Sequence, residues 1–161
     1  MLTLLAVLLL ALPPARAGST ELNPTTMAVT PDVITQYDAV RVSLVNDALP
    51  ATVSAARSLA ALSPGDQPLA SAATAVANAV DLPGARIAFG ELSRLLVQRI
   101  AATTPAPKVV TYFCPMFEQG FGYWLQPKAG IANPYMGQSM PACGEEVSLK
   151  TALKAATATA R

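Results

Sequence analysis

Apolar residues recur every three or four positions in four stretches of the chain between residues 31 and 102. This spacing places them on one face of an α-helix, so each stretch predicts an amphipathic helix. The first helix is expected to begin at Pro31, with Thr30 as its N-cap, and the second covers about 49–62. The third begins near Pro68. The fourth covers 85–102 and has the clearest apolar stripe, formed by Phe89, Leu92, Leu96 and Ile100.

Short stretches of turn-forming residues separate these helices, at 46–47, 63–66 and 81–84. Helices joined by such short connections pack as antiparallel neighbours. None of them is long enough to be stable alone in water, so each must bury its stripe against another. The pattern therefore predicts a mainly α fold, an up-down four-helix bundle over residues 31–107.

The pattern changes after the prolines at 105 and 107. Residues 109–113 are β-branched or aromatic and predict a short strand, with a small hairpin around Tyr123–Leu125. We expect segment 108–147 to be a loop-rich unit packed on the bundle, in one domain with it. Residues 145–160 have helical composition but weak amphipathicity, and 148–161 are interpreted as a tail.

The first 17 residues are typical of a secretory signal peptide. An apolar run from Leu2 to Leu12 precedes Ala15-Arg16-Ala17, an Ala-x-Ala cleavage pattern. The run is too short to cross a bilayer core, which needs about 20 residues. We therefore expect a periplasmic or secreted protein cleaved near Ala17, with a flexible leader at 18–30 and no membrane span in the mature chain.

Charge and composition exclude several classes of function. The chain has 11 Lys+Arg and 10 Asp+Glu, and loss of Arg16 with the signal peptide leaves 10 against 10, a net charge of zero. A neutral surface argues against nucleic-acid binding, which needs a basic footprint. Histidine is absent, which excludes histidine-based catalysis and the commonest zinc sites. We do not expect an enzyme.

The sulfur atoms of the chain are concentrated between residues 114 and 144. This segment holds both cysteines, three of the five methionines and the only tryptophan. Cys-x-Met at 114–116 and Met-x-x-Cys at 140–143 each place a thiol and a thioether close together. Soft sulfur donors of this kind select Cu(I) or Ag(I) over hard cations. The candidate ligands are Cys114, Met116, Met140 and Cys143.

The same residues allow a structural interpretation. Two cysteines in an exported protein form a disulfide by default, and closing this loop would stabilise the fold by roughly 3–4 kcal/mol. Met116 and Met140 would then fill gaps in a small core. The protein would be a disulfide-stapled helical interaction module of the cell envelope with no metal role. A thiol oxidoreductase is disfavoured because no Cys-x-x-Cys is present. Spacing alone leaves the disulfide and the metal site open.

The framework around these residues resembles a bacterial family named as a domain of unknown function. That family occurs in small exported proteins and as an appendage of periplasmic adaptor subunits of copper and silver efflux systems. The resemblance covers roughly residues 33–147. The residues that carry it are Cys114, Pro115, Met116, Gly122, Trp124, Leu125, Asn133, Pro134, Tyr135, Gly137, Met140, Cys143 and Gly144.

The resemblance implies copper handling by Cys114, Met116, Met140 and Cys143, with an efflux adaptor as a candidate partner. Met136 stands where the family usually has an aromatic residue, so it is not counted as a ligand. The combined prediction is a periplasmic Cu(I)-binding protein that serves as a chaperone, buffer or resistance accessory. A redox-switchable site, disulfide when empty and dithiol when loaded, would reconcile this prediction with the disulfide.

Overall fold

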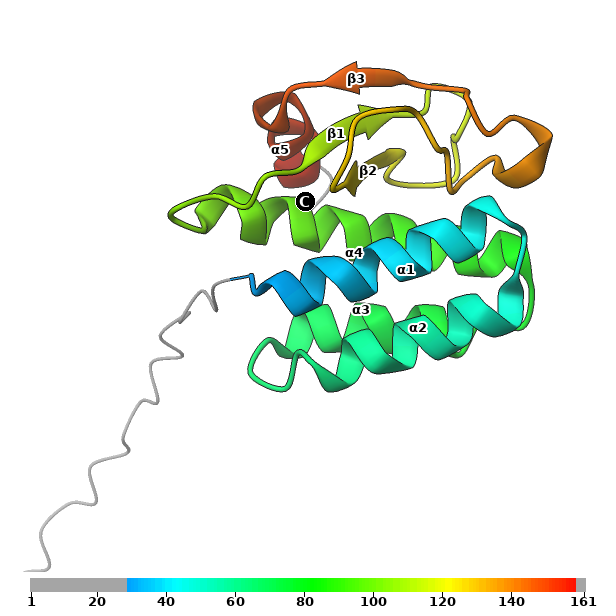
Figure 1. Ribbon diagram of the computed structural model, residues 1–161, viewed down its shortest axis with the longest axis horizontal. Helices are drawn as coiled ribbons and strands as arrows, with labels where there is room; N and C mark the ends of the chain where they lie inside the picture. The colour runs from blue at the N-terminus through cyan, green and yellow to red at the C-terminus, as the bar shows by residue number, and fades with distance from the viewer. Residues whose placement is uncertain (1–28, 159–161) are drawn as a thin grey trace, which may run out of the picture.

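The computed structural model describes residues 29–158 and shows a mainly α fold with a small sheet (Figure 1). Its helices are α1 (Pro31–Val45), α2 (Leu49–Ala61), α3 (Gln67–Ala77), α4 (Leu82–Ala102) and α5 (Leu149–Ala158). Its strands are β1 (Val110–Phe113), β2 (Tyr123–Gln126) and β3 (Glu145–Val147), and a 3₁₀ turn, η1, covers Gly137–Ser139. The predicted signal peptide and the leader up to residue 28 lie outside the described residues.

Helix starts follow the capping chemistry of the sequence. The Thr30 hydroxyl accepts from the Val33 amide at 3.4 Å, which confirms the predicted N-cap of α1. Asp66 and Asp81 cap α3 and α4 in the same way, and each of the first four helices has a proline in its first turn. Helix α4 begins three residues earlier than predicted, because Asp81 supplies the cap and Pro83 fits the first turn.

Consecutive helices run in opposite directions and pack against one another from α1 to α4 (Figure 1). Helices α2 and α3 approach closely through small residues, including the fully buried Ala56 and Ala73. Helices α1 and α4 meet through larger side chains, since the rings of Tyr37 and Phe89 stack with centroids 5.1 Å apart. The Tyr37 hydroxyl also lies 2.7 Å from the Ser93 hydroxyl of α4.

The sheet is antiparallel, with β1 between β2 and β3. It covers the side of α1 and α4 that faces away from α2 and α3 (Figure 1). Trp124 and Leu125 of β2 are fully buried, and the Leu125 amide donates to the Tyr37 hydroxyl at 3.2 Å. The predicted strand at 109–113 is confirmed within one residue. The third strand was not predicted.

Helix α5 differs from the tail expected at 148–161. Its Ala152 and Ala156 are fully buried, and it packs against α4. Arg94 and Gln98 of α4 donate to the Ala156 carbonyl oxygen at 3.3 and 3.2 Å. The prediction of weak amphipathicity is wrong, because one face of the helix buries these two alanines while Lys150 and Lys154 stay exposed on the other. Within residues 29–158, no helix is long and apolar enough to cross a bilayer.

Candidate functional site

Two proline-containing turns carry the four predicted ligands. The first follows β1 directly and is closed by the Phe117 amide, which donates to the Cys114 carbonyl at 3.4 Å. The second precedes β3 and is closed by the Cys143 amide, which donates to the Met140 carbonyl at 3.1 Å. A proline follows the first residue of each turn, where its fixed φ suits turn formation. Each turn therefore holds one thiol and one thioether.

Strand pairing brings the two cysteines together. Phe113 of β1 lies opposite Glu145 of β3, so the residues that follow β1 meet those that precede β3. Cys114 is fully buried and Cys143 is half-buried, and both are free thiols at the adjoining ends of the paired strands. Partial burial raises the pKa of the Cys143 thiol, and the neighbouring Cys114 raises it further through charge and hydrogen bonding.

The two predicted thioethers are exposed on the same turns. Met116 keeps 59% of its surface in contact with solvent, and Met140 keeps 43%. Neither side chain fills a gap in the core. Among the described residues, no three His, Cys, Asp or Glu side chains gather into a group that could hold a metal. The donors available at these turns are therefore sulfur atoms, which suit a soft monovalent cation better than Zn(II) or a hard cation.

Asn133 joins the second turn to the loop before it. It is fully buried, and its backbone amide donates to the Pro141 carbonyl at 2.8 Å. Its side-chain amide donates to the Cys143 carbonyl at 2.6 Å. Its side-chain oxygen accepts from the Tyr135 and Met136 amides at 2.8 and 3.2 Å. Asn133 thus fixes Cys143 and Met136 relative to each other, a role that the sequence motif alone did not reveal.

Tyr135 anchors this loop on the start of β2. It is buried, and its hydroxyl donates to the backbone carbonyls of Phe121 and Tyr123, at 2.9 and 2.6 Å. Its ring stacks on Phe117 with centroids 4.2 Å apart and meets the edge of Trp124 at 6.1 Å. Burial raises the pKa of the Tyr135 hydroxyl well above its ordinary range, so it remains a neutral donor.

Arg86 of α4 ties the same loop to the helices. Its Nε donates to the Pro134 carbonyl at 3.0 Å, and its guanidinium forms an ion pair with Asp47 at the end of α1. Gly137 lies against this pair with φ of +57°, and a Cβ there would collide with Asp47 and Arg86. The motif glycine is therefore required both by its backbone conformation and by the close approach of the ion pair.

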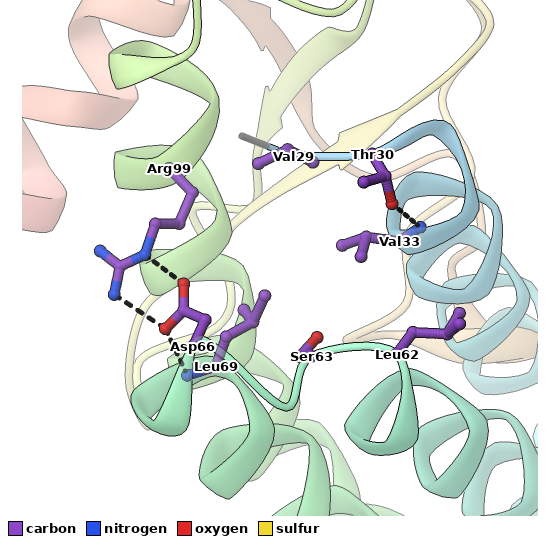
Figure 2. Close-up of a pocket in the computed structure, with 8 residues that line it drawn as sticks. All are labelled: Val29, Thr30, Val33, Leu62, Ser63, Asp66, Leu69 and Arg99. Carbon is purple, nitrogen blue, oxygen red and sulfur yellow. Dashed lines mark hydrogen bonds and ion pairs between the residues drawn. The ribbon is translucent and has the colours of Figure 1, made fainter. Parts of the chain in front are cut away.

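A small cavity lies near the C-terminal end of α4, away from the two turns (Figure 2). Its apolar lining residues are Val29, Val33, Leu62 and Leu69, and its ion pair joins Arg99 to Asp66. Its volume of about 50 Å³ is well below the roughly 300 Å³ of a small-molecule site. We interpret this cavity as a packing defect at the helix ends rather than as a site.

Comparison of the chain with protein-family models, with curated proteins and with solved structures finds no match. The resemblance to the copper-associated family therefore stays a prediction, and the functional argument depends on the geometry of the two turns.

Proposed function

We propose that this protein binds Cu(I) in the periplasm through the thiolates of Cys114 and Cys143. The observation that carries the proposal is the placement of two free thiols at the paired ends of β1 and β3, each on a proline turn that also carries a methionine. Met116 and Met140 are the candidate thioether ligands. The protein would serve as a copper chaperone, buffer or resistance accessory, with an efflux adaptor as a candidate partner and Ag(I) as an alternative cargo.

The chemistry of the site supports a soft cation. Each thiol that becomes a ligand releases its proton, so binding should weaken as the pH falls. Thioethers have no proton to lose and remain ligands in acid. Burial of Cys114 keeps one side of the thiol pair away from water, and Asn133 holds the Cys143 carbonyl in place. In this proposal α1–α4 act as an up-down four-helix bundle, the scaffold on which the ligand turns are docked.

An anaerobic titration of the reduced protein with Cu(I), in competition with a chromogenic chelator, tests the proposal. We expect one Cu(I) per chain with an affinity well below micromolar, and a large loss of affinity in the Cys114→Ser/Cys143→Ser variant. A Ser139→Ala variant is the matched control, because this exposed side chain lies near the second turn without a sulfur donor. Micromolar binding that is unchanged in the double serine variant would contradict the proposal.

The proximity of the two cysteines at the paired strand ends also favours a second candidate, the disulfide-stapled interaction module. A bond between Cys114 and Cys143 would join the end of β1 to the start of β3, where the strands are already paired. Thiol counting by mass spectrometry on protein taken directly from the periplasm distinguishes the two. A quantitative disulfide that resists mild reductant supports the module, and two free or metal-protected thiols support the copper protein.

A further inference from the structure

Met136, which the sequence analysis did not count as a ligand, lines a hollow beside the first turn. Its volume is about 330 Å³, and Met116 and Met136 both line it. The other residues that line it are Pro83, Arg86, Phe117, Glu118, Gln119 and Tyr135. Two thioethers from separate loops, 20 positions apart in the sequence, therefore face one solvent-accessible space. Met140 is not among the residues that line it.

Both loops are held in place by contacts outside the hollow. The turn of Met116 is closed by the hydrogen bond from Phe117 to Cys114. The backbone amide of Met136 donates to Asn133, and its carbonyl oxygen accepts from the Ser139 hydroxyl at 2.6 Å. The hollow is thus bounded by fixed backbone, so a ligand that binds both thioethers needs to order only the two side chains.

Core packing does not account fully for these side chains, although Met136 packs against the edge of the hydrophobic core. Methionine commonly fills irregular gaps in cores, but Met116 is 59% exposed and Met136 is only half-buried. The stacked rings of Phe117 and Tyr135 form one wall of the hollow, and aromatic faces attract cations. The Arg86 charge is paired with Asp47, and the Glu118 carboxylate adds a negative charge at the exposed rim. A monovalent cation therefore meets no unbalanced positive charge there.

We propose that Met116 and Met136 form a thioether site for a soft monovalent cation, Cu(I) or Ag(I), separate from the thiol pair. The inference rests on the proposed function for the class of metal, but not on the thiols as ligands. Because Met116 shares its turn with Cys114, the site lies next to the turn that carries this thiol. Thioethers are weaker ligands than thiolates, so the site would hold the ion less tightly than the thiol pair.

Nuclear magnetic resonance of the methionine methyl groups tests the site directly. The full chain is labelled with carbon-13 at the methionine methyls, in the Cys114→Ser/Cys143→Ser background, and titrated with silver nitrate in chloride-free buffer. The methyl signals of Met116 and Met136 should shift together and saturate at one equivalent, whereas that of Met140 should not move. Met116→Leu and Met136→Leu should each weaken Ag(I) binding by about tenfold or more, and Ile131→Leu, the matched control at an exposed apolar side chain outside the hollow, by less than about twofold.

Several outcomes would overturn the inference. The inference fails if no methionine methyl signal shifts, or if the shifts do not saturate as Ag(I) is added. It also fails if the Met116 signal shifts together with that of Met140 and not with that of Met136. If the serine variant unfolds, the same Ag(I) titration is carried out on the wild-type chain. There the thiols should bind the first equivalent of Ag(I), and the second equivalent should shift the Met136 methyl signal. Tight Cu(I) binding by the wild type without any Met136 shift refutes this inference and leaves the thiol site standing. A saturating shift of the Met136 methyl signal in a chain whose thiols bind no metal would support this inference and refute the proposed thiol site.

Discussion

The side-chain amide of Asn133 donates a 2.6 Å hydrogen bond to the backbone carbonyl of Cys143. The same side chain accepts from the amides of Tyr135 and Met136. One buried side chain therefore sets the position of a candidate thiol ligand and of a loop that borders the neighbouring methionine hollow.

Replacement of Asn133 by alanine should destabilise the protein and weaken metal binding. Three backbone groups would lose their partner, and each buried group left unpaired costs about 1–3 kcal/mol. We expect the free energy of unfolding to fall by about 3 kcal/mol or more, measured by chemical denaturation, and Cu(I) affinity to fall by about tenfold. Ser139→Ala, which removes one exposed hydrogen bond to Met136, should change stability by less than about 1 kcal/mol. Equal effects of the two variants would refute the central role of Asn133.

Gly137→Ala should be more destabilising than Gly130→Ala. Both glycines have a positive φ, +57° and +108°, but a Cβ at Gly130 would meet no atom within 4 Å. Gly130→Ala should cost only backbone strain, about 1–2 kcal/mol. Gly137→Ala would in addition displace Asp47 and Arg86, so we expect a loss of about 3 kcal/mol in thermal or chemical unfolding. If the two variants lose the same free energy of unfolding, the ion pair can move aside without cost. Its contact with Gly137 would then not contribute to stability.

Asp66 should make stability depend on pH in the acid range. The hydrogen bonds from Arg99 lower the pKa of Asp66 below its ordinary value of 3.8, and the Leu69 amide lowers it further. The unfolded chain then binds more protons than the folded chain, so this stability is present above the unfolded pKa and is lost as the pH falls through the lower folded pKa.

Asp66→Asn should be less stable than wild type near pH 6, and its free energy of unfolding should vary less between about pH 5 and pH 2. Arg99→Gln keeps the cap of α3 but removes the ion pair. Its free energy of unfolding should therefore also vary less with pH over the same acid range. Denaturation curves of the three proteins across this range check the prediction. If the free energy of unfolding of all three proteins changes in parallel with pH, the Asp66–Arg99 ion pair does not contribute to the loss of stability in acid.

Tyr37→Phe should loosen the contact between the sheet and the helices. The buried hydroxyl lies 2.7 Å from Ser93 Oγ and accepts from the Leu125 amide at 3.2 Å. We expect a loss of about 2 kcal/mol, since both partners are buried. Addition of Ser93→Ala to this variant should cost less than Ser93→Ala does alone, because the serine has already lost its partner. Simple additivity of the two changes in denaturant unfolding would argue against a direct interaction.

Local chemistry made the helical part of the fold predictable. Thr30, Asp66 and Asp81 cap helices whose first turns contain a proline, and these signals act within a few residues. The missed elements depend on distant partners. Strand β3 begins with Glu145 and Glu146, which have weak strand propensity, and it forms by pairing with β1.

The candidate site was predictable in its residue types but not in its grouping. Cys114 and Cys143 are separated by 28 residues, and only the pairing of β1 with β3 shows that they are brought together. Met136 was set aside because of its mismatch with the resembled family, and a hollow formed by two loops places it beside Met116. Side-chain neighbours across a loop-rich segment are determined by tertiary contacts such as those of Asn133, which have no periodic signature.

The only tryptophan of the chain is buried, stacked on Tyr112 at 5.3 Å, and lies so close to Gly144 that a Cβ there would touch its ring. Gly144 directly follows Cys143, so the fluorophore sits one residue from the thiol pair. The protein consequently carries its own optical probe. Excitation of Trp124 should report metal loading or oxidation of the cysteines as a change in emission, without any dye or label.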